Sequence, residues 1–267
     1  MSEFDFPAWS DHPDLVKYYS ENRCRPKDLY ASERRFLPWL ARQSKSLLDT
    51  GCAAGGFLPI WRYYNPSIEY VGVDVSSSLI ETARRVHPGV RFIQHNITAG
   101  LPLRDRSSVC VQALGWLNWE PGYENAIYEL WRLADRYLFM DLRLVSKPDQ
   151  VTVARQKIAL ASAWDGETTT PYVTVWWDRL ANILIDLEPI RLLGYGYWGS
   201  PAETVIGIDH KVCFAAFVLE KASLGSDRPL PVVCLDLPLE WPSDLMDRVR
   251  LLPHKDLATL VVPPEPL

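Results

Sequence analysis

The chain has 267 residues, of which 48% are hydrophobic and 23% are charged, and its formal net charge is −5. This length accommodates one large domain with an appendage, and the composition excludes a disordered chain. The negative charge argues against a nucleic-acid-binding protein. No signal peptide opens the chain and no apolar run is long enough to span a bilayer, so we expect a cytoplasmic protein without a membrane partner.

The five cysteines do not form a metal-binding or disulfide pattern. They are Cys24, Cys52, Cys110, Cys213 and Cys234, and no two of them stand in a C-x-x-C pair. A scattered, odd-numbered set is typical of free thiols in a reducing compartment. We therefore expect neither a structural zinc site nor a disulfide framework.

Residues 1–45 predict a helical N-terminal cap. The pattern favours helices over Leu15–Glu21 and Asp28–Arg42. Tyr18, Tyr19 and Tyr30 suit ordinary helix packing, and as a group they could also close over a bound ligand. The cap is therefore a candidate wall of a binding site.

A glycine-rich turn follows the first predicted strand. In the stretch Ser46–Phe57 (SLLDTGCAAGGF), a short apolar run ends at Asp49, and small residues then lead into an amphipathic segment. Small residues let the backbone approach a ligand closely, and the N-terminus of a following helix offers free N–H groups. Alone, such a turn is weak evidence for a nucleotide site.

The next predicted strand strengthens this interpretation. Ile68–Val73 ends at Asp74, which stands 23 residues after Gly51. An acid about 20 residues beyond the glycine turn, at the tip of the neighbouring strand, is placed to accept hydrogen bonds from ribose hydroxyls. The alternative is a pair of loop aspartates in an unrelated α/β protein.

Strands and helices continue to alternate. The predicted elements are a helix opened by Ser78 and Glu81, strands over Val90–Gln94, Val109–Leu114 and Tyr137–Leu142, and a helix that starts after Pro121-Gly122. Alternation of this kind indicates a parallel, doubly wound sheet.

The pattern changes beyond Asp141. The sequence predicts a helix over Asp149–Trp164, an extended segment over Thr168–Val175, a helix over Trp177–Leu187, and an antiparallel hairpin formed by Ile190–Trp198 and Lys211–Leu219. Further on, Val232–Leu235 and Thr259–Val262 suit short strands around a helix over Ser243–Leu251. We thus expect an α/β fold with a seven-stranded, mostly parallel sheet and an antiparallel C-terminal hairpin.

With these ordered motifs, residues 44–220 resemble the class I S-adenosylmethionine-dependent methyltransferases, which have a Rossmann-like fold. The run Asp49-Thr50-Gly51-Cys52-Ala53-Ala54-Gly55 resembles the first motif of that family, and Asp74 matches its ribose-binding acid. The resemblance divides the chain into a cap (1–45), a cofactor-binding domain (46–221) with an acceptor-binding insertion (143–176), and an extension of unassigned role (222–267).

The resemblance also implies which residues bind S-adenosylmethionine. The glycine turn would pass under the methionine moiety, Val75 would lie beside the adenine, and Asn96 would accept a hydrogen bond from the adenine amino group. The full predicted set is Asp49, Thr50, Gly51, Cys52, Ala53, Gly55, Asp74, Val75, Asn96, Ile97, Leu114 and Gly115. Two departures from the family pattern weaken the match slightly: Ala53 replaces a glycine, and Asn96 replaces an aspartate.

The acceptor and the proton-accepting residue are less well defined. Methyl transfer mainly requires alignment of donor and acceptor and exclusion of water, so no strong catalytic motif is needed. Candidate proton acceptors are His210, His12 and Asp141, and candidate substrate-binding residues are Tyr18, Tyr19, Trp116 and Trp164. Aromatic walls favour a small-molecule acceptor with a hydroxyl or amine, such as a sugar or a natural product.

Alternative functions remain open at this point. A nicotinamide-dependent oxidoreductase would need glycine where Ala53 stands, and an aminopropyl transferase would usually carry acidic residues within Gly115–Trp119, which has none. A non-catalytic methyltransferase-like partner subunit is a further alternative. A catalytic metal is disfavoured because the fourth strand does not end in an acid. The oligomeric state is not predicted.

Overall fold

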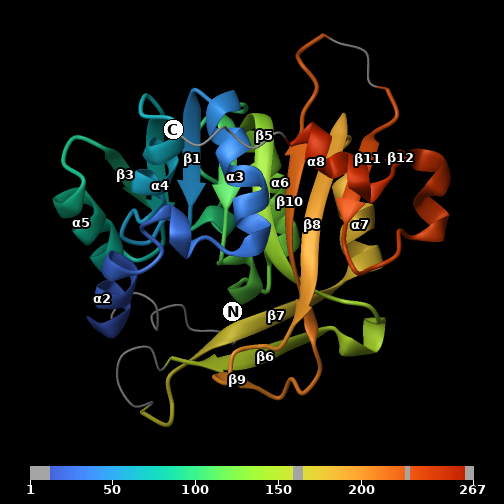
Figure 1. Ribbon diagram of the computed structural model, residues 1–267. Helices are drawn as coiled ribbons and strands as arrows, with labels where there is room; N and C mark the ends of the chain where they lie inside the picture. The colour runs from blue at the N-terminus through green and yellow to red at the C-terminus, as the bar shows by residue number, and fades with distance from the viewer. Residues whose placement is uncertain (1–12, 159–164, 226–228, 262–267) are drawn as a thin grey trace.

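The computed structural model describes residues 13–158, 165–225 and 229–261 (Figure 1). The strands of its main sheet are β1 (Ser46–Thr50), β2 (Glu69–Asp74), β3 (Arg91–Gln94), β4 (Ser108–Ala113), β5 (Ala134–Val145), β8 (Arg191–Gly199), β10 (Val212–Glu220), β11 (Val232–Asp236) and β12 (Arg250–Leu252). They lie in the order β12-β11-β8-β10-β5-β4-β1-β2-β3.

The seven strands from β8 to β3 in this order form the predicted core sheet. β1, β2, β3, β4 and β5 pair in parallel, whereas β10 pairs antiparallel with both β5 and β8. This arrangement confirms the mostly parallel, doubly wound sheet with an antiparallel hairpin. The segment after residue 221 then extends the sheet, because β11 pairs with β8 and β12 pairs with β11.

Helices cover both faces of the sheet. The α-helices are α2 (Pro13–Glu21), α3 (Ala31–Gln43), α4 (Phe57–Tyr64), α5 (Ser77–Val86), α6 (Tyr123–Leu133), α7 (Trp177–Asp186) and α8 (Leu257–Leu260). Apolar residues of α6 and α7 join one buried cluster, and those of α3, α4, α5 and α8 join a second. The sheet therefore separates two hydrophobic cores, as expected of strands buried on both faces.

Short 3₁₀ helices connect several of these elements. They are η1 (Pro26–Asp28), η2 (Ile97–Ala99), η3 (Leu117–Trp119), η4 (Pro148–Gln150), η5 (Ser243–Arg248) and η6 (His254–Asp256). Of these, η2 and η3 directly follow the region where β3 and β4 end, so they lie where a ligand would bind in an open α/β sheet.

A small sheet branches from the end of β5. It consists of β6 (Thr152–Lys157), β7 (Thr169–Trp176) and β9 (Val205–Ile206), and β7 pairs in parallel with the last residues of β5. In Figure 1 this sheet lies below the main sheet, on the side where β1 ends. It therefore faces the carboxyl edge of the parallel strands.

Two sequence predictions of secondary structure were wrong, and a third was right only in part. The predicted helix over Asp149–Trp164 is η4 followed by β6 as far as residue 157, and residues 159–164 lie outside the described part. The β-branched Thr152 and Val153 favour a strand, and pairing with β7 decides the matter. The predicted strand over Thr259–Val262 overlaps α8, and the predicted helix over Ser243–Leu251 is η5 followed by the start of β12.

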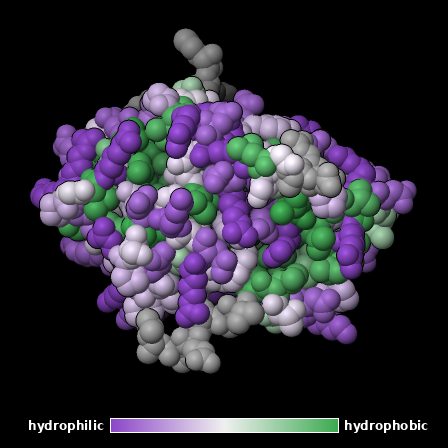
Figure 2. Space-filling view, turned by 90° about the horizontal axis from the view of Figure 1, so that it is seen from above, coloured by the Kyte–Doolittle hydropathy of each residue, from purple (hydrophilic) through white to green (hydrophobic). Residues whose placement is uncertain are grey.

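The surface hydropathy, the helix lengths and the cysteines bear on the predictions from composition. The face seen from above in Figure 2, on the far side from the small sheet, carries mostly hydrophilic side chains with apolar patches between them. Within residues 13–158, 165–225 and 229–261, no helix is long and apolar enough to cross a membrane. All five cysteines are free thiols, as predicted.

The stability of the core should depend strongly on Trp177. Its side chain is 1% exposed, stacks on Phe217 with ring centroids 5.7 Å apart, and donates from Nε1 to the carbonyl oxygen of Glu240 at 2.8 Å. We expect Trp177→Ala to lower the free energy of unfolding by about 3–5 kcal/mol in denaturant titration. Trp198, which is 37% exposed, is the matched control, and Trp198→Ala should cost less than about 1 kcal/mol. Equal losses in the two variants would contradict the assignment of Trp177 to the core.

Candidate active site

A cavity of about 410 Å³ lies at the carboxyl edge of the parallel strands. Its size falls in the range of small-molecule sites. The register of the strands explains its position, because Thr50 lies opposite both Val73 and Ala113. The residues that follow β1, β2 and β4 therefore meet at one place.

Most of the predicted cofactor-binding residues line this cavity. They are Gly51, Cys52, Ala53, Asp74, Val75, Asn96, Ile97, Leu114 and Gly115. The remaining three, Asp49, Thr50 and Gly55, are not among its lining residues. The structure thus gathers turns from four different strands around one space.

Asp49 instead belongs to a buried hydrogen-bond network under the glycine turn. Its carboxylate accepts from the Tyr70 hydroxyl at 2.5 Å and from Gln112 Nε2 at 2.8 Å, and Gln112 Oε1 accepts from Trp61 Nε1 at 2.7 Å. Burial raises the pKa of Asp49 to about 7, although the two hydrogen bonds act in the opposite direction. Asp49 therefore stabilises the end of β1, from which the glycine turn starts, through buried hydrogen bonds.

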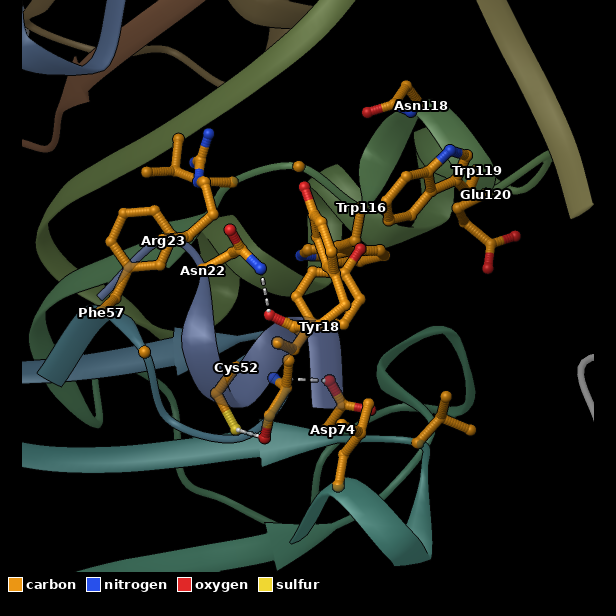
Figure 3. A pocket seen from close by; sticks show the side chains of 18 of the residues that line it. Tyr18, Asn22, Arg23, Cys52, Phe57, Asp74, Trp116, Asn118, Trp119 and Glu120 are labelled. Atoms are coloured by element: carbon orange, nitrogen blue, oxygen red, sulfur yellow. Dashed lines mark hydrogen bonds between the residues drawn. The ribbon is translucent and has the colours of Figure 1, made fainter. Parts of the chain in front are cut away.

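Asp74 ties the glycine turn to the end of β2. Its carboxylate accepts from the backbone N–H of Ala53 and of Ser76, each at 2.9 Å. Burial raises the pKa of Asp74, and its backbone hydrogen bonds oppose the shift. Figure 3 shows Asp74 at the floor of the cavity, with the bond to the turn drawn as a dashed line. Its unused lone pairs fit the hydroxyls of a ribose.

The turn itself has the left-handed backbone that close approach requires. Gly51 has a φ of +67°, and a Cβ added there would lie 2.4 Å from Cδ1 of Trp116. Ala53 has a φ of 47°, which is unfavourable for a residue with a Cβ. The indole of Trp116 thus lies directly against the turn, and its Nε1 donates to Thr50 Oγ1 at 3.3 Å.

The N-terminal cap closes one side of the cavity. The residues of the cap that line it are Tyr18, Tyr19, Asn22, Arg23 and Tyr30. They include the two tyrosines predicted to bind substrate, Tyr18 and Tyr19, and the third tyrosine of the predicted group, Tyr30. The guanidinium of Arg23 lies 4.2 Å from the Tyr30 ring centroid and 5.2 Å from that of Phe57. Its Nη2 donates to Glu33 at 2.5 Å, while its buried Nη1 has no partner among the described residues. Arg23 was not among the residues predicted from the sequence.

The opposite wall is formed by the loop that contains η3. Trp116, Asn118, Trp119 and Glu120 line the cavity there, and Figure 3 shows them across from Arg23 and Phe57. The small sheet supports this wall, because Trp119 Nε1 donates to Gln156 Oε1 at 2.9 Å. Gln156 Nε2 in turn donates to Thr204 Oγ1 at 3.0 Å.

One buried carboxylate connects the ends of β4 and β5. Asp141 Oδ1 accepts from the backbone N–H of Gly115 at 2.6 Å, and its Oδ2 accepts from Arg143 Nη1 at 2.9 Å. Arg143 lines the cavity and is only 8% exposed, yet its buried Nε has no partner among the described residues. A guanidinium with an unsatisfied donor thus lies beside Gly115.

The predicted proton acceptors do not gather at the cavity. Asp141 is buried with both carboxylate oxygens engaged, and His210 is not a lining residue; its Nδ1 lies 3.6 Å from Asp209. His12 and Trp164 lie outside the described residues. Three of the lining residues gave no sequence signal: Arg143 lies within β5, and Asn118 and Glu120 lie in the loop after β4, at positions where many residue types occur.

Comparisons with known proteins decide the family. A family profile described as a methyltransferase domain matches residues 47–136. A trans-aconitate 2-methyltransferase from Variovorax paradoxus (strain S110) is 31% identical over 202 residues, which span 75% of this chain and 71% of that protein. The chain belongs to the class I S-adenosylmethionine-dependent methyltransferases.

Two further similarities agree with this assignment. A trans-aconitate 2-methyltransferase from Paracidovorax citrulli (strain AAC00-1) is 25% identical over 119 residues, or 45% of this methyltransferase and 44% of that protein. The crystal structure of the N-terminal domain of EvdMO1, in the presence of SAH and D-fucose, has a TM-score of 0.51 at 13% identity. That match covers 80% of this chain and 85% of the other, and it supports the fold alone.

Membership of this family makes S-adenosylmethionine the cofactor and sets aside the oxidoreductase and aminopropyl-transferase alternatives. The donor set of the cavity suits the cofactor, since Asp74 offers a carboxylate to a ribose and the turn at Gly51 leaves no room for a side chain. Within the described ranges, no group of three His, Cys, Asp or Glu residues is arranged to hold a metal ion.

The glycine turn provides a matched pair of variants. Gly51→Ala would force the new Cβ against Trp116 and impose a left-handed backbone on alanine, so we expect S-adenosylhomocysteine affinity to fall at least tenfold, or about 1.4 kcal/mol. Ala53→Gly removes backbone strain, and affinity should stay within about threefold. Isothermal titration calorimetry on both variants checks this. Equal affinities in the two would show that the turn does not lie against the cofactor.

Asp74→Asn tests the ribose contact. The amide keeps one acceptor oxygen for the neighbouring backbone N–H groups but loses the charge. We expect S-adenosylhomocysteine binding to weaken by about 1.5–3 kcal/mol, the scale of a hydrogen bond to a charged group. Thermal melting without ligand should verify that the variant is folded. Unchanged affinity in a folded variant would place the ribose elsewhere.

Proposed function

We propose that this methyltransferase transfers a methyl group from S-adenosylmethionine to a carboxylate oxygen of a small organic acid. The observation that carries the proposal is Arg143, a buried guanidinium that lines the cavity with an unpartnered Nε and is linked through Asp141 to Gly115. Guanidinium groups bind carboxylates strongly and with defined geometry. The names of the curated relatives, trans-aconitate 2-methyltransferases, support the same substrate chemistry.

The cofactor would be held by the strand ends. Asp74 would accept from its ribose hydroxyls, and the turn from Gly51 to Gly55 would pass under its methionine part. Asn96 would lie beside the adenine, but its Oδ1 already accepts from the N–H and the hydroxyl of Thr98. Arg23 would offer its free Nη1 to the methionine carboxylate. When bound, S-adenosylmethionine supplies a methyl group already activated by a positively charged sulfur.

A carboxylate acceptor explains why no proton acceptor is needed. A carboxylic acid is ionised at neutral pH, so its oxygen attacks without loss of a proton. The chain then has to orient the acid through Arg143 and exclude water by means of the N-terminal cap and the η3 wall. The positions of His210 and Asp141 outside the cavity lining are compatible with this chemistry.

The hydroxyl or amine acceptor favoured by the sequence remains the second candidate. Such a group needs a base when it must lose a proton. Glu120 is the carboxylate that the η3 wall offers, and burial raises its pKa, although the hydrogen bond from the Gly122 N–H opposes the shift. Mass spectrometry of the product distinguishes the two candidates, because a methyl ester is lost in mild alkali and an ether or methylamine is not.

Arg143→Lys is the direct test of acid recognition. Lysine keeps the ion pair with Asp141 but removes the planar guanidinium. With trans-aconitate and related acids as acceptors, we expect KM for the acid to rise at least tenfold, or about 1.4 kcal/mol, while S-adenosylhomocysteine affinity stays within about threefold.

The matched control is Arg155→Lys, an exposed change on β6 outside the cavity. It should leave KM unchanged. If wild-type protein bound to cofactor methylates no carboxylic acid in a broad panel, the proposed acceptor is wrong. An Arg143→Lys variant with normal KM would remove Arg143 from acid binding.

A further inference from the structure

The η3 wall holds one buried oxygen without a hydrogen-bond partner and one carboxylate without a basic partner among the described residues. Asn118 is 3% exposed and lines the cavity, and its Oδ1 has no hydrogen-bond partner among the described residues. Glu120 is 9% exposed and lines the same cavity. Its Oε1 accepts from the backbone N–H of Gly122 at 2.7 Å, but no basic side chain of the described residues pairs with it. Buried polar groups normally have partners, so the Asn118 oxygen calls for a donor. Glu120 Oε2 accepts no hydrogen bond from the described residues, so it can take a donor as well.

The surroundings of these two residues suit a donor from a ligand. Trp116 and Trp119 line the cavity on the same wall, and Figure 3 shows Glu120 beside Trp119, away from Arg23. Aromatic faces favour a cationic group or the C–H surface of a small molecule. The guanidinium groups of the cavity do not compensate Glu120, because Arg23 pairs with Glu33 and Arg143 pairs with Asp141.

We propose that Glu120 and Asn118 form a subsite for a hydrogen-bond-donating substituent, a hydroxyl or an ammonium group, on the acid that Arg143 binds. The subsite rests on the proposed function for the identity of the acid. It makes the cavity two-sided: Arg143 binds a carboxylate, and the η3 wall binds a donor.

The subsite predicts a preference among acids of one carbon skeleton. Succinate, malate and aspartate differ only in whether they carry a hydrogen, a hydroxyl or an ammonium group, and tricarballylate and isocitrate form a second such pair. We expect the donor-bearing acids to bind the S-adenosylhomocysteine-saturated protein at least tenfold more tightly than their unsubstituted partners, as measured by calorimetry. Affinities within threefold across each set would overturn the subsite.

Glu120→Gln is the variant that isolates the charge. Glutamine retains an Oε1 for the N–H of Gly122, so the loop should fold normally, which a melting curve verifies. We expect the preference for donor-bearing acids to fall to within about threefold. The loss should be larger for aspartate than for malate if an ammonium group is the natural donor. Asn118→Leu, which removes the other oxygen, should weaken the same acids.

Glu203→Gln, an exposed change that does not line the cavity, is the matched control and should leave every affinity unchanged. A preference that persists in both Glu120→Gln and Asn118→Leu would also overturn the subsite.

Binding and turnover separate this inference from the proposed function. If donor-bearing acids bind preferentially in a Glu120-dependent way but yield no methyl ester, carboxylate methylation is wrong and the subsite stands. If acids are methylated without any donor preference, the proposed function stands and the subsite is wrong. If none of the acids binds, both are overturned.

Discussion

The register of the parallel strands is the constraint on which the whole site depends. Because Thr50 lies opposite Val73 and Ala113, the chain leaves β1, β2 and β4 at the same level of the sheet. The glycine turn, Asp74 and the residues after Leu114 are separated by more than 20 residues in sequence, yet they line one cavity. A slip of one residue in any of these strands would exchange its two sets of side chains between the two cores and shift its tip relative to the cavity.

Buried carboxylates then hold the strand ends in place. Asp49 supports the turn through Tyr70 and Gln112, Asp74 binds the turn through the Ala53 N–H, and Asp141 joins Gly115 to Arg143. Each carboxylate is desolvated, which is unfavourable unless hydrogen bonds compensate for the lost water. Three buried carboxylates at one edge of a sheet are typical of a binding site and unusual in a hydrophobic core.

The small sheet shows how tertiary pairing changed a local preference. Residues 151–158 have apolar positions compatible with a helix, and they fall within the helix predicted over Asp149–Trp164. In the structure, β6 lies between β7 and β9, and Gln156 reaches from it to Trp119 across the cavity wall. The segment therefore supports the η3 loop. Nothing local indicates that partner, because β9 is about 50 residues away in the chain.

The sequence alone determined the alternation of strands and helices, the glycine turn and the acid at Asp74. These features depend on short-range chemistry, because apolar runs form buried strands and small residues allow left-handed turns. Asp74 reaches the glycine turn because only one helix separates its strand, β2, from β1. Only the tertiary structure determined which residues face the acceptor side of the cavity. Arg143 and Asn118 are ordinary residues in the sequence, and they become distinctive because folding buries each of them with one polar atom that lacks a partner among the described residues. Glu120 becomes distinctive because it is buried without a basic side chain beside it. Burial and hydrogen-bond satisfaction depend on contacts between distant segments, which no local pattern encodes.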